Sequence, residues 1–286
     1  MVAILDCIGR TPIVRLNRLS RILDAHIFMK LETRNPGGSL WDRLALAYVR
    51  GALERGDLSR SGCIVEAADA AFGLSLALVS AQHDVRLILC VPATVGGQSV
   101  GLMRELGAQV IVTPAEKGMR GAMDKAAFHH EDTWGSFRPE PLRNQDGPQA
   151  LYRGAGAEIV TDARREGLRI DAFVCPVGSG AACTGIGKRL REAFPGIHLM
   201  AIRADVPGSS ELGGMPSEVF EPDIVAETLH VSAEDAAGSR RRLFAMESIN
   251  AGLETGAALL GALTLARRPA FRNRNIVCIA GEGRNV

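Results

Sequence analysis

Lysine and aromatic residues are scarce in this chain of 286 residues. Aromatic residues make up 5% of it, and only four of its 33 basic residues are lysines, at positions 30, 117, 125 and 188. Chemistry that needs a primary amine therefore has few candidates. Long apolar runs are missing as well, since the longest, 85–91 and 257–265, are much shorter than the roughly 18 residues of a membrane-spanning helix. We expect no membrane association, and the opening residues have no pattern of a secretion signal.

Neither sign of charge is in excess. The 33 basic and 32 acidic residues leave a net charge of +1, so the chain lacks the broad basic field that attracts nucleic acid. Its six cysteines are too few for a disulfide scaffold at this length, and no two of them have the spacing of metal ligands. We therefore expect a cytoplasmic protein with free, mostly buried thiols, no metal site and no nucleic-acid partner.

Short, β-branched apolar segments alternate with helical patterns along most of the sequence. The expected strands are Cys63–Ala67, Val85–Val91, Gln109–Thr113, Ala172–Pro176, Leu199–Arg203 and Asn275–Ala280. This alternation is typical of parallel sheets with helices on both faces. The polar stretch 133–147 is predicted to be an irregular crossing between domains, and 205–222 to be a loop.

A helix start is predicted at Ser39, directly after the turn Asn35-Pro36-Gly37-Gly38. Ser39 is expected to be the N-cap, and Asp42 to complete a capping box. The apolar residues that follow at helical spacing, and so define the buried face, are Trp41, Leu44, Ala45, Tyr48, Val49 and Ala52. The indole of Trp41 is therefore expected to point inward.

Several motifs follow one another in a recognisable order. They are Ile8–Asn17, Lys30-Leu31-Glu32, Asn35–Ser39 with Asp42-Arg43, Val177–Gly180 with Thr184-Gly185, and Thr255–Ala258. On these motifs the chain resembles the cysteine synthases (O-acetylserine sulfhydrylases), a family of fold-type II enzymes that use pyridoxal phosphate (PLP). The resemblance implies an α/β, tryptophan synthase β-like architecture of two parallel-sheet domains with a cleft between them. The smaller domain is expected at 36–140, and the larger at 1–35 and 141–286.

The resemblance fails at the residue that carries the family's chemistry. In the family, the residue before the Asp-Arg pair is the lysine that forms the Schiff base with PLP, and here it is Trp41. An indole supplies no primary amine. The family's layout places the chain's lysines elsewhere: Lys30 on a strand under the site, Lys117 and Lys125 on a peripheral helix, and Lys188 two turns along a helix. We expect none of them within reach of the cofactor position.

Other positions also lack the residues with which the family binds its substrate and cofactor. Its substrate-binding Thr-Ser-Gly-Asn-Thr-Gly loop is replaced by Ala68-Asp69-Ala70-Ala71-Phe72-Gly73. This replacement removes hydrogen-bonding side chains and adds the carboxylate of Asp69, which would repel a substrate carboxylate. The family's substrate-facing glutamine corresponds to Pro141, and the serine facing the pyridine nitrogen corresponds to Glu282. The segment that closes over the cofactor is not recognisable in 213–223.

Each of these residues has two interpretations. Trp41 and Phe72 are either ordinary core aromatics or rings that fill the space of PLP, since protein interiors tolerate few voids. The turn Gly178-Ser179-Gly180-Ala181-Ala182 either only joins a strand to a helix or also binds a small anion through its N–H groups. Cys183 is either a reactive thiol or a small packed residue. Glu282 would be able to pair with the pyridinium nitrogen of free PLP.

Three functions are open at this stage. The first is a pseudoenzyme without PLP that acts by binding a ligand or a protein: a second copy in a homodimer, an active paralogue or another pathway protein. The second is a PLP-independent enzyme whose remodelled cleft, with Asp69, Glu282, Cys183 and the 178–182 turn, acts on a small substrate of a specialised biosynthetic pathway. The third is residual cysteine synthase or β-replacement activity with PLP held non-covalently.

Overall fold

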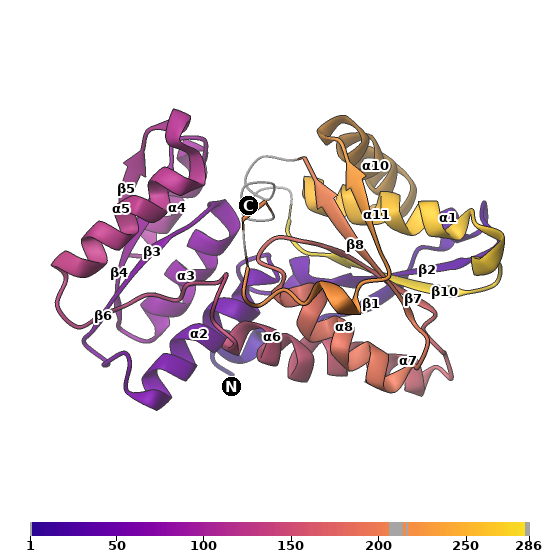
Figure 1. Ribbon diagram of the computed structural model, residues 1–286, viewed down its shortest axis with the longest axis horizontal. Coiled ribbons are helices and arrows are strands. Elements are labelled where there is room, and N and C mark those ends of the chain that lie inside the picture. The colour runs from indigo at the N-terminus through magenta and orange to yellow at the C-terminus, as the bar shows by residue number, and fades with distance from the viewer. Residues whose placement is uncertain (1, 206–213, 216, 284–286) are drawn as a thin grey trace.

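The architecture consists of two β-sheets with helices packed around them (Figure 1). A computed structural model describes residues 2–205, 214–215 and 217–283. The six-stranded sheet has the order β1-β2-β10-β7-β8-β9, and the four-stranded sheet has the order β5-β4-β3-β6. The strands are β1 Ile13–Arg15, β2 His26–Leu31, β3 Cys63–Ala67, β4 Arg86–Pro92, β5 Gln109–Thr113, β6 Ser136–Phe137, β7 Ala172–Pro176, β8 His198–Ala204, β9 Glu227–Val231 and β10 Asn275–Ala280.

Among the strands of the described residues, all pairs except one are parallel, as the alternating pattern predicts. The exception is β1, which pairs antiparallel with β2 at the edge of the larger sheet. Four expected strands, β3, β5, β7 and β10, have the predicted bounds, and β4 and β8 differ from the predicted bounds by one residue at each end. Such short apolar runs form strands because burial on both faces favours β-branched side chains at every position.

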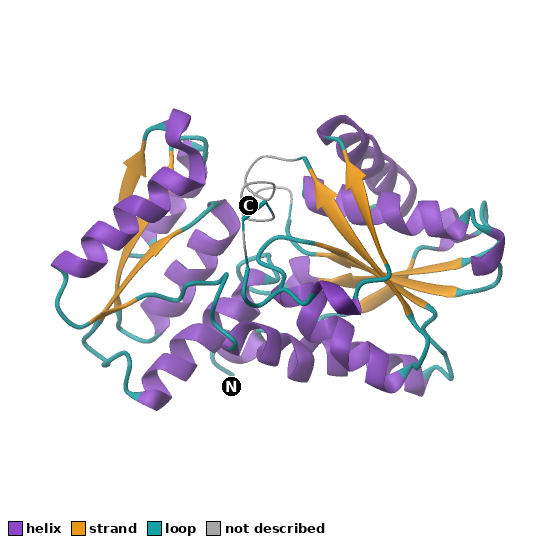
Figure 2. Ribbon diagram, in the orientation of Figure 1, coloured by secondary structure: helices purple, strands orange, loops and turns teal. Residues whose placement is uncertain are grey.

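Helices cover both faces of each sheet (Figure 2). They are α1 Asn17–Ser20, α2 Trp41–Arg55, α3 Ala70–Gln82, α4 Gly97–Glu105, α5 Gly118–Asp132, α6 Asp146–Leu151, α7 Ala157–Arg165, α8 Ala181–Ala193, α10 Ala233–Glu247 and α11 Leu253–Ala266. On the larger sheet, α7 and α8 pack on one face and α10 and α11 on the other. On the smaller sheet, α5 covers one face and α3 and α4 the other. Within the described ranges, no helix is both long enough and apolar enough to cross a membrane.

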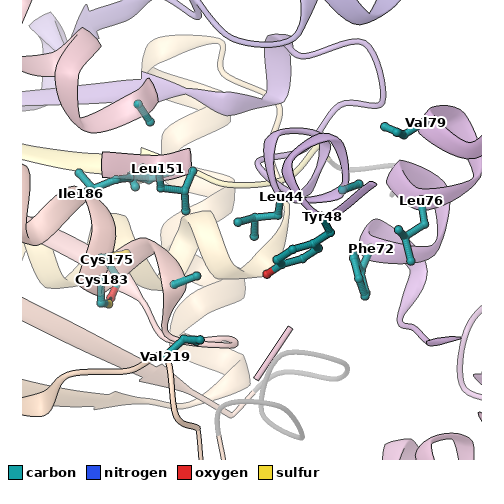
Figure 3. Close-up of a cluster of buried hydrophobic side chains, with 14 of the residues drawn as sticks. Leu44, Tyr48, Phe72, Leu76, Val79, Leu151, Cys175, Cys183, Ile186 and Val219 are labelled. Carbon is teal, nitrogen blue, oxygen red and sulfur yellow. The ribbon is translucent and has the colours of Figure 1, made fainter. Parts of the chain in front are cut away.

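Helix α2 connects the two sheets through one continuous core (Figure 3). Its side chains Leu44 and Tyr48 lie between Phe72 of α3 on one side and Leu151 of α6 on the other. The rings of Tyr48 and Phe72 meet edge to face, with their centroids 6.3 Å apart. The predicted buried face of α2 is confirmed from Leu44 to Ala52, and the domain bounds at 36–140 stay a prediction.

The predicted capping box at the start of α2 is wrong. The helix begins at Trp41, its N-cap is Leu40, and no side chain caps it. Ser39 Oγ accepts the N–H of Trp41 at 3.1 Å. The carboxylate of Asp42 does not turn back to Ser39, because it accepts the Gly37 N–H and the Ser75 hydroxyl, both at 2.6 Å. Asp42 therefore ties the start of α2 to α3.

The stretch 133–147 is also more regular than predicted. It contains β6, which pairs with β3 through Cys63 opposite Ser136, and the first residues of α6. The buried carboxylate of Glu66 in β3 accepts the N–H of Glu140 at 2.6 Å. This long-range hydrogen bond orders a segment whose composition alone predicts a loop.

A buried network of charges fixes α2 against the larger sheet. The guanidinium of Arg43 donates to both carboxylate oxygens of Glu32, at 2.7 and 3.0 Å, and to both oxygens of Glu158, each at 2.7 Å. Lys30 Nζ lies 2.7 Å from Glu158 and donates to the carbonyl of Thr11 at 2.6 Å. Two cations therefore balance two anions, which buried charges require.

This network makes folding stability sensitive to pH through Glu158. Burial alone would raise the pKa of Glu158, but the hydrogen bonds and charges of Arg43 and Lys30 lower it from 4.5 to about 2. We expect Glu158→Gln to lower the free energy of unfolding near pH 7 by about 3 kcal/mol. The pKa of Glu158 is lower in the folded state than in the unfolded state. The stabilisation by its ionised carboxylate is therefore complete above pH 4.5 and is lost as the pH falls toward 2. Urea unfolding at a series of pH values measures the difference.

The control is Glu166→Gln at the exposed C-terminal end of α7, where the side chain is 65% exposed. We expect it to change stability by less than about 0.5 kcal/mol at every pH. A Glu158→Gln difference that stays constant from neutral to acidic pH would contradict the role of this ionised carboxylate.

Candidate functional site

Three backbone segments meet where strands β7 and β10 end. They are the turn 38–40 before α2, the turn 178–182 that leads into the first residues of α8, and Gly281–Glu282 after β10. The Leu40 N–H donates to the Gly281 carbonyl at 2.7 Å, and the Gly283 N–H donates to the Gly38 carbonyl at 2.9 Å. The carboxyl ends of parallel strands are the usual position of a binding site in an open α/β sheet.

A small cavity lies between these segments. Its volume is about 50 Å³, whereas small-molecule pockets usually have roughly 300–1,000 Å³. Its lining residues are Leu40, Trp41, Leu44, Asp69, Pro176, Gly178, Ser179, Gly180, Ala182, Glu254, Gly281 and Glu282. The structure thus brings together most of the residues singled out in the sequence. Ala71, Phe72 and Ala181 are buried and are not among these lining residues.

The ring of Trp41 lines the cavity and packs against the ring of Phe72 from α3. The ring centroids of Trp41 and Phe72 are 4.7 Å apart, and the ring planes are tilted by 37°. Phe72 is 1% exposed and also contacts Tyr48 edge to face. Three aromatic side chains therefore pack in sequence from the cavity into the shared core.

The segment 68–73 is the start of a helix and not a loop. Asp69 is the N-cap of α3, and its Oδ1 accepts the N–H of Phe72 at 2.8 Å. Ala70, Ala71 and Phe72 form the first turn of that helix. The carboxylate of Asp69 therefore both caps α3 and lines the cavity.

Three carboxylates surround this cavity. Burial raises the pKa of Glu282 well above its usual range, and the nearby charges of Glu254 and Asp69 raise it further. Glu254 was missed in the sequence, although it directly precedes the Thr255–Ala258 motif and lies in the first turn of α11. Within the described residues, no group of three or more His, Cys, Asp and Glu side chains has the arrangement of a metal site.

The turn 178–182 approaches other parts of the chain closely. Gly180 is the N-cap of α8 with a φ of +92°, and a Cβ there would lie 2.9 Å from Cγ of Phe220. The Ser217 hydroxyl donates to the Ser179 carbonyl at 2.6 Å. Whether the turn binds an anion stays a prediction, and the contact with Phe220 explains the glycine at position 180 without a ligand.

The four lysines lie outside the cavity, as far as the described lining residues extend. Lys30 is fully buried in the ion network with Glu158, and Lys188 pairs with Glu221 at 2.5 Å. Lys125 Nζ lies 4.9 Å from the centroid of the Phe128 ring. Lys117 is the N-cap of α5.

Two other predicted positions, Cys183 and Pro141, are not among the lining residues of this cavity. Cys183 is 4% exposed, and its thiol donates to the Cys175 carbonyl at 3.6 Å, as expected of a packed residue. Pro141 lines a different cavity. Within 213–223, where the family's closing segment is not recognisable, positions 213 and 216 lie outside the described residues, as do positions 206–213 of the predicted loop.

Removing the charge of Glu282 tests whether its ionised carboxylate destabilises the fold. We expect Glu282→Gln to raise the midpoint of thermal unfolding by about 2 °C near pH 8, since glutamine keeps the shape and removes a destabilised charge. The pKa of Glu282 is higher in the folded state than in the unfolded state, so ionisation of Glu282 destabilises the fold most at high pH. The midpoints of the two proteins should converge below about pH 4.

Glu105→Gln provides a matched control, because this glutamate is exposed at the end of α4. Its midpoint should equal that of the unmodified chain at each pH. A lower midpoint for Glu282→Gln near pH 8 would show that the carboxylate stabilises the site.

Comparison with known proteins agrees with this architecture. The chain matches the family of pyridoxal-phosphate dependent enzymes over residues 4–281. A probable cysteine synthase from Bacillus subtilis (strain 168) is 32% identical over 289 residues, which cover 97% of this chain and 93% of that protein. The crystal structure of a hydrogen sulfide-producing enzyme from Fusobacterium nucleatum superposes with a TM-score of 0.92 at 27% identity, covering 99% of this chain and 98% of that one.

The cysteine synthase of Entamoeba histolytica gives a TM-score of 0.91 at 25% identity, covering 99% of this chain and 88% of that one. These structures confirm the predicted fold class, an α/β fold-type II architecture with two sheets of mainly parallel strands. The chain therefore belongs to the pyridoxal-phosphate dependent enzyme family and is a homologue of the cysteine synthases.

Proposed function

We propose that this family member is a pseudoenzyme, which forms no Schiff base with PLP and acts by binding a ligand or a protein. The observation that carries the proposal is the cavity of about 50 Å³ beside Trp41, at the place where the resemblance puts the family's lysine and cofactor. A cavity of this size holds one or two water molecules.

The residues of this cavity do not fit PLP. None of the described lining residues offers a primary amine, and the Trp41 and Phe72 rings are in contact where a cofactor ring would need space. The carboxylates of Asp69, Glu254 and Glu282 would repel a phosphate group. We therefore derive no catalytic step through PLP.

Cysteine synthase or β-replacement activity is the second candidate. The names of the matched relatives favour it over a pseudoenzyme, because they are a probable cysteine synthase, a cysteine synthase and a hydrogen sulfide-producing enzyme. For this chain the activity would require PLP to enter the filled cavity and another group to replace the lysine amine.

A PLP-independent enzyme is the third candidate, and one observation favours it. The pKa of Glu282 is raised by burial and by the nearby charges of Glu254 and Asp69, which is the direction of shift that a general acid needs. Cys183 contributes less to this candidate, because its thiol is buried against a backbone carbonyl.

The proposed partners follow from the pseudoenzyme role. We propose a homodimer, or a pair with an active paralogue or another pathway protein. A small anion at the 178–182 turn remains part of the proposal, with the main-chain N–H groups of the turn as donors. The three carboxylates around the same cavity would compete with that anion.

The test is the visible absorbance of the purified chain after addition of PLP, together with an assay of cysteine formation from O-acetylserine and sulfide. We expect neither the yellow band of a Schiff base nor cysteine. The double variant Trp41→Lys/Phe72→Thr supplies an amine and removes a ring, and it should develop the band. The matched control is Trp134→Lys, because Trp134 is 98% exposed and is not among the residues that line this cavity.

A Schiff-base band or cysteine production by the unmodified chain would refute the pseudoenzyme and establish the second candidate. A band in Trp134→Lys as strong as in the double variant would show that the band reports unspecific reaction of PLP with surface lysines.

A further inference from the structure

Two of the six cysteines lie next to each other behind the wall of the cavity beside Trp41. Cys175 is in β7 and Cys183 is in the first turn of α8, and their thiols are in contact. Figure 3 shows the two side chains side by side. Neither the family resemblance nor the proposed function gives this pair of thiols a role.

The main-chain carbonyl of Pro176 lies close to both sulfur atoms. Cys175 Sγ is 3.4 Å from this oxygen, and Cys183 Sγ is 3.7 Å from it. Cys183 Sγ is also 3.6 Å from the carbonyl oxygen of Cys175. A disulfide bond forms only between cysteines whose side chains already point toward each other, and this pair meets that requirement.

The other cysteines are placed differently. Cys63 is the first residue of β3, and Cys90 of β4 pairs with the last residue of β3, so the two are at opposite ends of that strand. The thiol of Cys278 in β10 donates to the Phe28 carbonyl at 3.5 Å. Cys7 is exposed near the N-terminus. These residues provide internal controls for the chemistry of the pair.

The pair is buried but adjoins the cavity. Cys175 is 2% exposed and Cys183 is 4% exposed, whereas their chain neighbours Pro176 and Ala182 line the cavity. A cavity of about 50 Å³ holds one or two water molecules, so it admits an oxidant as small as hydrogen peroxide. Burial excludes larger oxidants such as glutathione disulfide.

We propose that hydrogen peroxide oxidises this pair to a disulfide, which joins the end of β7 to the first turn of α8 and so braces the turn 178–182. Five residues that line the cavity lie between the two cysteines along the chain: Pro176, Gly178, Ser179, Gly180 and Ala182. Oxidation would therefore fix this part of the cavity wall, and reduction would release it. The proposal is independent of whether the chain uses PLP.

The oxidation proceeds in two steps. Burial raises the pKa of Cys175 well above its usual range, so we assign the first step to the sulfur of Cys183. This sulfur attacks one oxygen of the peroxide: an S–O bond forms, the O–O bond breaks, and the thiol proton leaves in the first water. The sulfur of Cys175 then attacks that of Cys183: the S–S bond forms, the S–O bond breaks, and the Cys175 proton leaves in the second water. The two thiols lose two electrons, and the peroxide gains them.

The mass of one tryptic peptide tests for the disulfide in the full chain. Trypsin cuts after Arg169 and Lys188, so both cysteines belong to the peptide 170–188. The native chain is treated with hydrogen peroxide, unfolded, alkylated with iodoacetamide and digested. We expect this peptide without alkylation and lighter by two hydrogen atoms than its reduced form. Dithiothreitol added before alkylation should restore both alkylation sites.

Cys278 is the matched control in the same digest, because it is equally buried and belongs to a different peptide. It should stay alkylated, as should Cys175 in the variant Cys183→Ser. Full alkylation of 170–188 after peroxide treatment would overturn the proposal. Equal oxidation of the native pair by glutathione disulfide would overturn the assignment of peroxide as the oxidant. Both results come from the unmodified chain, so they decide the matter even if Cys183→Ser fails to fold.

Hydrogen exchange measures the bracing of the turn. The main-chain amides of 178–182 should exchange about tenfold more slowly in the oxidised chain than in the reduced chain, because the disulfide opposes local opening. Cys183→Ser given the same peroxide treatment should show no slowing, which separates the disulfide from other effects of the oxidant. Equal exchange in the oxidised and reduced chains would refute the bracing.

Discussion

The pairing of Arg43 with Glu32 and Glu158 is the constraint on which the site depends. Four hydrogen bonds from one guanidinium to two carboxylates fix how α2 is rotated about its axis. Residues two positions apart on a helix point about 200° away from each other. Because Arg43 faces the ion network beside the larger sheet, Trp41 faces the opposite way, where its ring meets Phe72 of α3. The position of the indole is therefore set by charges that lie on the other side of the helix.

Packing makes this arrangement stable without a ligand. A void lined by apolar groups destabilises a fold by roughly 24 cal/mol per Å³, so an empty space of about 100 Å³ would cost about 2 kcal/mol. The contacts from Trp41 to Phe72 and from Phe72 to Tyr48 leave only a small volume between the two sheets. Because Tyr48 also belongs to the core shared by both sheets, any change at Phe72 would affect the stability of the whole molecule as well as the shape of the cleft.

The strands were predictable because their signal is local. Runs such as Cys63–Ala67 and Asn275–Ala280 are apolar throughout, and a buried parallel strand requires little else. The features that were mispredicted depend on distant partners. Asp42 has the spacing of a capping box, but it binds Ser75 of α3. Glu254 belongs to the cavity only because α11 begins beside the end of β10, a relation that no short pattern encodes. The resemblance to a family located the cavity, whereas its size depends on how the rings pack.

Helix starts explain the electrostatics of this cavity. The positive ends of α3, α8 and α11 all lie near it, an arrangement that ordinarily favours an external anion. In this chain the negative charges belong to the protein itself: Asp69 caps α3, and Glu254 lies in the first turn of α11. Glu282 is held at the start of α11 by its main-chain carbonyl, which accepts the N-cap N–H of that helix at 3.0 Å. Burial and, after it, the charges of Glu254 and Asp69 raise the pKa of Glu282, so these helix ends do not offset the cost of a third negative charge. A phosphate group would add negative charge where the site already favours taking up a proton.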